Sequence, residues 1–239
     1  MAKTARDYSA TWGKWSGKRE LVRGLLHFSV GLVGWVLVHL IQLDADLITF
    51  LLCLVSFVFI VLDGVRLAIN RWHNTDCFTR FLQWIDNRLV KKFFTRETEN
   101  HQQTTTVASV LGLSTAWIIG PRWICAAVIL YFGLIDPLAK LGKYWPIVVF
   151  ERGWAKDKSL GGVLFGLAGG GIGLVTVLLV NYWVQIIPLE LTLWQALVVF
   201  LVGLFSASLS ELIGRKADNF LIPVSSAIAM VVVYNQFFS

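Results

Sequence analysis

The sequence predicts an all-α, polytopic membrane protein with about seven transmembrane helices and one amphipathic helix at the membrane surface. Of its 239 residues, 56% are hydrophobic, whereas apolar usage in soluble domains is about 45–50%. The mean hydropathy is +0.66, and the charged residues are clustered between long apolar runs. Runs near ~20 residues are what a helix needs to cross a bilayer. We therefore predict one integral membrane domain over residues 1–239.

The apolar runs give the predicted spans in order along the chain. They cover residues 24–41, 47–62, 105–119, 123–138, 162–184, 191–209 and 220–237. Gly120-Pro121 separates the third span from the fourth, because glycine and proline both disfavour the interior of a helix. The fifth span contains the glycine-rich stretch GLAGGGIGL at 166–174. Such small residues allow either close helix packing or close approach of a ligand to the backbone.

The longest polar segment, residues 63–104, contains a predicted amphipathic helix. Its apolar residues recur at helical spacing on one face: Phe78, Phe81, Leu82, Ile85 and Leu89. Polar residues occupy the other face: Arg80, Gln83, Asn87 and Lys91. This pattern is typical of a helix that lies in the membrane interface.

The positive charges predict the orientation. All of the 21 Lys and Arg except Arg122 fall in segments that an alternating seven-span topology puts on one side: 1–23, 63–104, 136–162 and 210–219. Positive loops face the cytoplasm, so we expect a cytoplasmic, uncleaved N-terminus and an external C-terminus. The net charge of +6 thus reflects topology, and we expect no nucleic-acid partner. The three cysteines show no paired spacing, which indicates neither disulfides nor a thiolate metal site.

The first group of polar residues lies where the chain first enters the membrane. Glu20, Arg23 and His27 are spaced i, i+3 and i+7, so one helical face presents an acid, a guanidinium and an imidazole. The alternative is that Arg23 snorkels to the interface and His27 is a packed core histidine.

The segment 136–162 is the predicted nucleotide-binding loop. Asp136, Lys140 and Lys143 share a face if the fourth helix continues, and Lys158-Ser159 would lie at the N-terminus of the fifth helix. Lysines, a helix N-terminus and a carboxylate suit a polyphosphate with its magnesium ion. The alternatives are topological positive charge and a helix boundary at Asp136-Pro137. The P-loop pattern is absent.

A third group precedes the last span. Glu211 ends the sixth apolar run, and Asp218-Asn219 follows seven residues later, before Pro223. A helix cap is the alternative explanation for Asp218-Asn219, but it does not account for a carboxylate at the end of an apolar helix.

Taken in order, these blocks resemble the diacylglycerol/polyprenol kinase family, which includes dolichol kinase, phytol kinase and CTP-dependent diacylglycerol kinase. The matching patterns are E-x-x-R-K-x-x-H, D-x-x-A-x-x-x-G with K-S-x-E-G, and an acid followed by D-N-x-x-x-P. They fall on Glu20, Arg23, His27, Asp136, Ala139, Lys158, Ser159, Gly162, Glu211, Asp218, Asn219 and Pro223. The chain departs from the family at Gly24, usually Lys, at Gly161, usually Glu, and at Pro146, where glycine is common.

The resemblance implies transfer of the γ-phosphoryl group of CTP, or of ATP, to the hydroxyl of a membrane lipid alcohol at the cytoplasmic face. It implies Asp136 and His27 as catalytic residues and Asp136, Glu211 and Asp218 as ligands of Mg²⁺. The implied nucleotide-binding residues are Arg23, Lys140, Lys143, Lys158, Ser159, Gly162 and Asn219. The acceptor is a polyprenol, a phytol-type alcohol or diacylglycerol.

Two other functions are weighed against this one. A phosphatidate cytidylyltransferase would use the same CTP and magnesium, but its H-G-G-x-x-D-R-type motif is missing. A non-enzymatic transporter would need polar groups spread across the bilayer, whereas the acids here gather at one interface.

Overall fold

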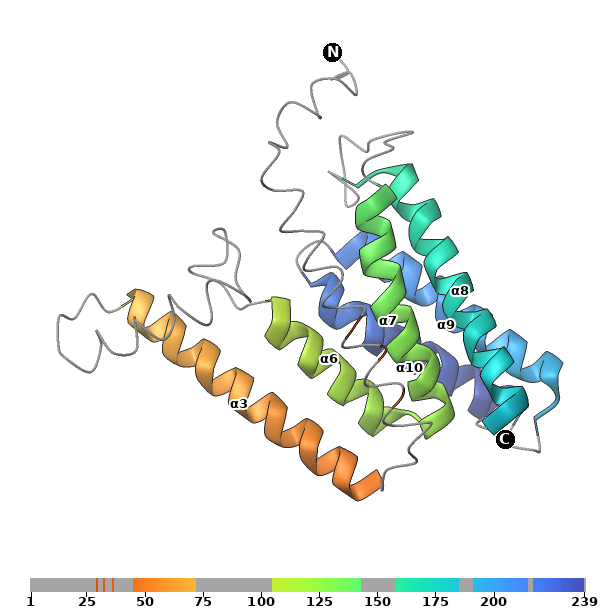
Figure 1. The fold of residues 1–239 in the computed structure, drawn as a ribbon, viewed down its shortest axis with the longest axis horizontal. Coiled ribbons are helices and arrows are strands. Elements are labelled where there is room, and N and C mark those ends of the chain that lie inside the picture. Colours follow the sequence, from red (N-terminus) through yellow and green to blue (C-terminus); the bar gives the residue numbers. More distant parts are fainter. Residues whose placement is uncertain are drawn as a thin grey trace, which may run out of the picture.

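The computed structural model describes residues 29, 32, 36, 45–71, 105–142, 158–184, 191–214 and 217–238. Within these ranges the regular structure is entirely helical (Figure 1). The helices are α3 (Ala45–Arg71), α6 (Thr105–Ile119), α7 (Arg122–Gly142), α8 (Leu160–Val184), α9 (Leu193–Gly214) and α10 (Asp218–Phe237).

The described helices agree with the second to seventh predicted spans. Five of them are long and apolar enough to cross a membrane, and α6 is a shorter apolar helix. In the first predicted span only Ser29, Leu32 and Val36 are described, and all three are helical. The predicted count of seven is therefore not confirmed. The amphipathic segment 78–91 lies outside the described residues, and α3 continues to Arg71, beyond the predicted end of the second span.

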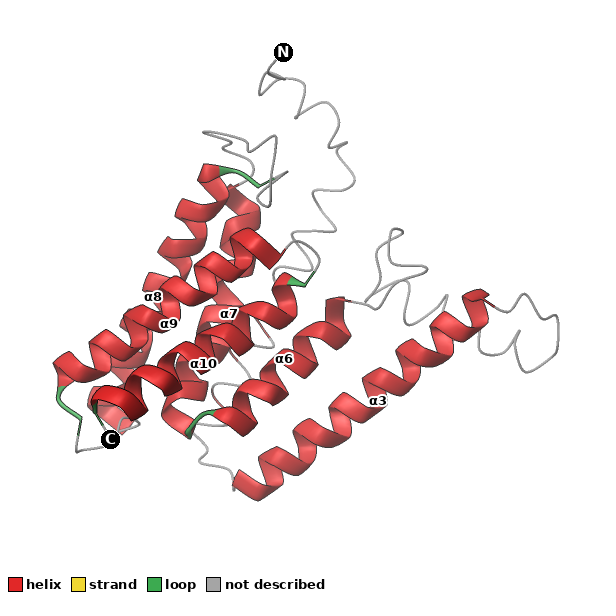
Figure 2. Ribbon diagram, turned by 180° about the vertical axis from the view of Figure 1, so that it is seen from behind, coloured by secondary structure: helices red, strands yellow, loops and turns green. Residues whose placement is uncertain are grey.

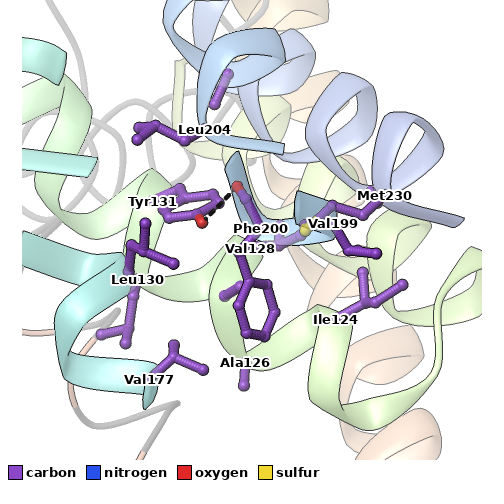
Figure 3. Packing of buried hydrophobic residues seen from close by; sticks show 14 of the residues in the cluster. Ile124, Ala126, Val128, Leu130, Tyr131, Val177, Val199, Phe200, Leu204 and Met230 are labelled. Atoms are coloured by element: carbon purple, nitrogen blue, oxygen red, sulfur yellow. Dashed lines mark hydrogen bonds between the residues drawn. The ribbon is translucent and has the colours of Figure 1, made fainter. Parts of the chain in front are cut away.

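Helix α7 forms the centre of the bundle. In the apolar window of α7, 67% of the residues are buried, against 17% in that of α3. Helix α7 contacts α6, α8, α9 and α10. Ile124, Tyr131 and Ile135 on α7 are fully buried. The Tyr131 hydroxyl donates a hydrogen bond of 2.8 Å to the backbone carbonyl of Phe200 on α9 (Figure 3). This bond satisfies a polar group that would be costly to leave unpaired inside the apolar core.

Helix α3 lies at the outer edge of the bundle and packs along α6 (Figure 2). Two polar contacts join these helices: Ser56 Oγ to Ser114 Oγ at 2.9 Å, and Trp117 Nε1 to Thr49 Oγ1 at 2.9 Å. Side-chain hydrogen bonds of this kind link helices in lipid, where the hydrophobic effect does not. The outward face of α3 carries exposed apolar side chains, including Phe57 at 65%, as expected for a face toward lipid.

The predicted break at Gly120-Pro121 is confirmed. Helix α6 ends at Ile119 and α7 begins at Arg122. The carbonyl of Pro121 accepts the N–H groups of Ile124 at 3.0 Å and Cys125 at 3.1 Å, which starts the new helix. Proline suits this position because the first N–H groups of a helix have no intrahelical acceptor.

The glycine-rich stretch of α8 serves helix packing. A Cβ at Gly169 would lie 2.7 Å from the Leu134 carbonyl oxygen, and a Cβ at Gly170 would lie 2.0 Å from Leu204 Cδ1. Gly166 and Gly173 lie on the same side and also contact α7. The absence of side chains therefore lets α8 approach α7 and α9 closely. Of the two interpretations of this stretch, the structure supports close packing.

This packing predicts that alanine substitution changes the stability of the protein differently at two glycines of α8. Gly169→Ala places a methyl group against the backbone of α7, and overpacking of this kind costs about 1–3 kcal/mol. Gly171→Ala meets nothing within 4 Å and gains helix propensity. We expect a lower thermal unfolding temperature in detergent for Gly169→Ala, and an unchanged or higher one for Gly171→Ala. Equal effects of the two substitutions would contradict the packing assignment.

Candidate functional site

The C-terminal end of α7 carries the first charged pair. The helix continues past Pro137 to Gly142, so Asp136 and Lys140 lie one turn apart on one face. Lys140 Nζ lies 2.5 Å from Asp136 Oδ2. Asp136 and Lys140 were predicted to share a face if the fourth helix continued, and it does. Lys143 lies outside the described residues.

The start of α8 lies directly against the end of α7. A Cβ on Gly142 would lie 2.4 Å from the Gly161 carbonyl oxygen and 2.8 Å from Gly162 Cα, so the two backbones are in contact. Ser159 Oγ accepts the N–H of Gly162 at 3.0 Å, which makes Ser159 the N-cap of α8. This cap and the contact at Gly142 fix the position of the preceding Lys158.

The end of α9 and the start of α10 supply the other acids. Glu211 lies in the last turn of α9 and is 5% exposed. Asp218 is the first residue of α10, and its Oδ1 accepts the N–H of Asn219 at 2.9 Å. The N-cap residue is Ala217, which makes no side-chain capping bond. Asp218 is therefore not a helix cap. It places a negative charge in the first turn of α10, where the helix dipole favours one.

Lys158 joins these helix ends. Its Nζ lies 2.6 Å from Glu211 Oε1 and 3.5 Å from Asp218 Oδ2. Asp218 also interacts electrostatically with Asp136 and Lys140, so the pair on α7 belongs to the same group. We call Asp136, Lys140, Lys158, Glu211 and Asp218 the ionic cluster. Since α7 and α9 run toward it and α8 and α10 run away, it occupies one end of the bundle.

Most of the ionic cluster is shielded from solvent. Asp136 is 1% exposed and Lys158 is 7% exposed, while the side chains of Lys140 and Asp218 are each 17% exposed. Buried charges are tolerated only when they are paired or hydrogen-bonded. Among the described members of the cluster, three carboxylates face two ammonium groups.

A divalent cation is compatible with the donor chemistry of the ionic cluster. Carboxylate oxygens are the ligands that Mg²⁺ prefers, and the ammonium of Lys158 already occupies the position of a cation between Glu211 and Asp218. Among the described residues, however, no three acids, histidines or cysteines converge closely enough to hold a metal ion together. The described residues best suited to bind a divalent cation are therefore Glu211 and Asp218, which share the ammonium of Lys158.

The remaining predicted site residues fall into two groups. Arg23 and His27 lie outside the described residues, like Lys143. Gly162 is buried, donates to the Ser159 cap and packs on Gly142, and Asn219 is 3% exposed beside Asp218. Neither contact assigns a nucleotide-binding role, so this role stays a prediction for Ser159, Gly162 and Asn219.

Sequence reasoning missed the hydroxyl pair next to the ionic cluster. Ser210 Oγ and Ser225 Oγ lie 2.6 Å apart and join α9 to α10, and Ser210 immediately precedes Glu211. The sequence feature that could have indicated this pair is the presence of serines in otherwise apolar helices, in ASLSE on α9 and in VSS on α10. This bond holds together the two helices that carry Glu211 and Asp218.

Comparison with protein-family models, with curated proteins and with solved structures finds no match to this chain.

The ion pair at Lys158 predicts a measurable coupling. Lys158→Met leaves the buried carboxylate of Glu211 and the partly buried one of Asp218 without this partner. Loss of one partner of a buried pair costs about 3–5 kcal/mol. In the double variant Lys158→Met/Glu211→Leu, the free energy of unfolding should fall by less than the sum of the single losses, with a coupling of about 0.5–3 kcal/mol.

Chemical unfolding in detergent of the single and double variants measures this coupling. The control is Arg122→Met, which removes a cation from an exposed position at the other end of α7 and should change stability by about 0.5 kcal/mol or less. Additive losses would show that the contact at 2.6 Å contributes nothing.

Proposed function

We propose that this protein is a membrane-embedded lipid-alcohol kinase. It transfers the γ-phosphoryl group of a nucleoside triphosphate, CTP or ATP, to the hydroxyl of a polyprenol, a phytol-type alcohol or diacylglycerol. The observation that supports this proposal is the ionic cluster itself. Its members come from two separate sequence blocks, Asp136 to Lys158 and Glu211 to Asp218, and these blocks are brought together at one end of the bundle.

The chemistry of the ionic cluster suits phosphoryl transfer. This reaction depends mainly on positioning and on stabilisation of the charge on the phosphoryl oxygens. Lys140 and Lys158 are the residues that bind these oxygens. Glu211 and Asp218, with Asp136 nearby, are the residues that would hold magnesium, which when bound neutralises phosphate charge.

In the proposed reaction the lipid hydroxyl oxygen forms a bond to the γ-phosphorus. The bond between that phosphorus and the β–γ bridging oxygen breaks, and the nucleoside diphosphate leaves. Asp136 orients the hydroxyl and accepts its proton. His27, which lies outside the described residues, is the second candidate for this role.

The surroundings of the ionic cluster suit an acceptor that stays in the bilayer. Exposed apolar side chains lie within two turns of its members: Leu164 on α8 at 47%, and Leu209 and Ile213 on α9 at 52% and 46%. A lipid tail can lie along these side chains while its hydroxyl reaches the helix ends. The proposal puts this end and the N-terminus at the cytoplasmic face, which the distribution of Lys and Arg in the sequence supports.

The placement of charge argues against a transporter. In α6 to α10 the described charged residues lie within about two turns of a helix end, and Asp136 is the one nearest the middle of its span. Secondary transporters bind their substrates near the bilayer midplane. The cytidylyltransferase alternative shares the donor and the metal, and the experiment below separates it from the kinase.

The test is phosphate transfer by the purified protein in detergent with magnesium and γ-labelled CTP or ATP. The acceptors are dolichol, a short polyprenol, phytol and diacylglycerol. We expect label in one lipid, and Asp136→Asn should reduce the rate at least about 100-fold, since a general base contributes about 10²–10⁴. The matched control is Asp46→Asn, the same change in the first turn of α3, where an exposed carboxylate should be dispensable.

The same preparation is given phosphatidate and α-labelled CTP. Formation of CDP-lipid without any labelled lipid phosphate would assign the protein to the cytidylyltransferases instead. Absence of both products would contradict the proposal.

A further inference from the structure

The carboxylates that suit a metal ion are occupied by the protein's own lysines. The ammonium of Lys158 contacts both Glu211 and Asp218, and Lys140 contacts Asp136. Each lysine proposed to bind phosphate therefore already contacts a carboxylate proposed to bind a cation or the substrate hydroxyl. Each carboxylate of the ionic cluster therefore already has an ammonium group of the protein beside it.

This arrangement opposes binding of either ligand alone. A divalent cation at Glu211 and Asp218 must displace the ammonium of Lys158, which is 7% exposed and would be left as an uncompensated buried charge. A polyphosphate alone must draw Lys158 away from Glu211 and Asp218 and then face these two carboxylates without their counter-ion. Repulsion between like charges is strong where solvent screens poorly.

The two ligands together remove both obstacles. Phosphate oxygens offer Lys158 a new partner, and the divalent cation compensates the carboxylates that Lys158 leaves. A flexible lysine side chain with rotatable donors can make this exchange without a change in the backbone. The N-cap at Ser159 and the contact of Gly142 with Gly161 hold the backbone beside Lys158 in place.

We propose that Lys158 acts as an internal counter-ion that makes the divalent cation and the triphosphate bind as a pair. The inference rests on the proposed function, because it takes a nucleoside triphosphate as the ligand. Lys140 acts on Asp136 in the same way, but its pairing is local to one turn of α7 and its side chain is more exposed. Lys158, which links α8 to α9 and α10, therefore contributes the larger part.

The test measures Mn²⁺ bound to the full-length protein in detergent, from the EPR signal of free Mn²⁺ after subtraction of the Mn²⁺ that the nucleotide probe binds in a protein-free control. The nucleotide probe is a CTP analogue with a methylene group between the β- and γ-phosphorus, so no turnover is needed. In the wild type we expect the analogue to tighten Mn²⁺ binding at least about 10-fold, and Mn²⁺ to tighten analogue binding by the same factor.

Lys158→Gln removes the internal counter-ion. We expect it to bind Mn²⁺ alone at least about 5-fold more tightly than the wild type does, and the gain from the analogue to shrink correspondingly. Arg122→Gln, which removes the same charge at the other end of α7, should leave Mn²⁺ binding unchanged. If Lys158→Gln is not monodisperse, Lys140→Gln gives the same comparison at Asp136, with a smaller expected gain.

Two outcomes would overturn the inference, and they are distinguishable. If the wild type binds the analogue but Mn²⁺ binding is the same with and without it, Lys158 does not couple the ligands and the proposed function stands. If the wild type binds neither the analogue nor Mn²⁺ at millimolar concentration, the inference fails together with the proposed function.

Discussion

The bundle has to compensate charges that its own helices bring into a low-dielectric interior. Glu211 and Asp136 are almost completely buried, and an isolated ionised carboxylate in such a place is prohibitively costly. Lys140 compensates Asp136 within α7. Lys158 compensates Glu211 at the point where α8 begins, because its ammonium contacts Glu211 and Asp218 together. One side chain therefore links the start of α8 to the end of α9 and the start of α10.

Close backbone packing makes the compensation geometrically possible. Lys158 reaches Glu211 only because α8 begins directly against the end of α7, where Gly142 meets Gly161. Further along, Gly169 keeps α8 in contact with α7. The glycines and the charges thus serve one arrangement: small residues set the distances between helices, and the ion pairs stabilise the helix ends.

Most of the helical architecture follows from sequence pattern. The third predicted span, residues 105–119, has the bounds of α6, because Gly120-Pro121 interrupts the helix unambiguously. The fourth predicted span ends near 138, whereas α7 continues to Gly142. Pro137 removes only one backbone hydrogen bond, and α7 continues past it. The sequence analysis predicted all five members of the ionic cluster as residues of one site. It predicted phosphate as the partner of the lysines, and the structure shows that each lysine also contacts a carboxylate. It could not show that Lys158 contacts Glu211, because a contact across 53 residues depends on helix packing.

The two lysines of the ionic cluster differ in when their partners become available during synthesis. Chains are made from the N-terminus at about 5–20 residues per second, so α7 enters the membrane before α9 exists. Lys140 lies four residues from Asp136, and α7 can neutralise its own acid as soon as its last turn forms. Lys158 must wait until Glu211 has been made. The local pair thus lets the central helix partition into lipid early, and the long-range pair completes the assembly when the last two helices arrive.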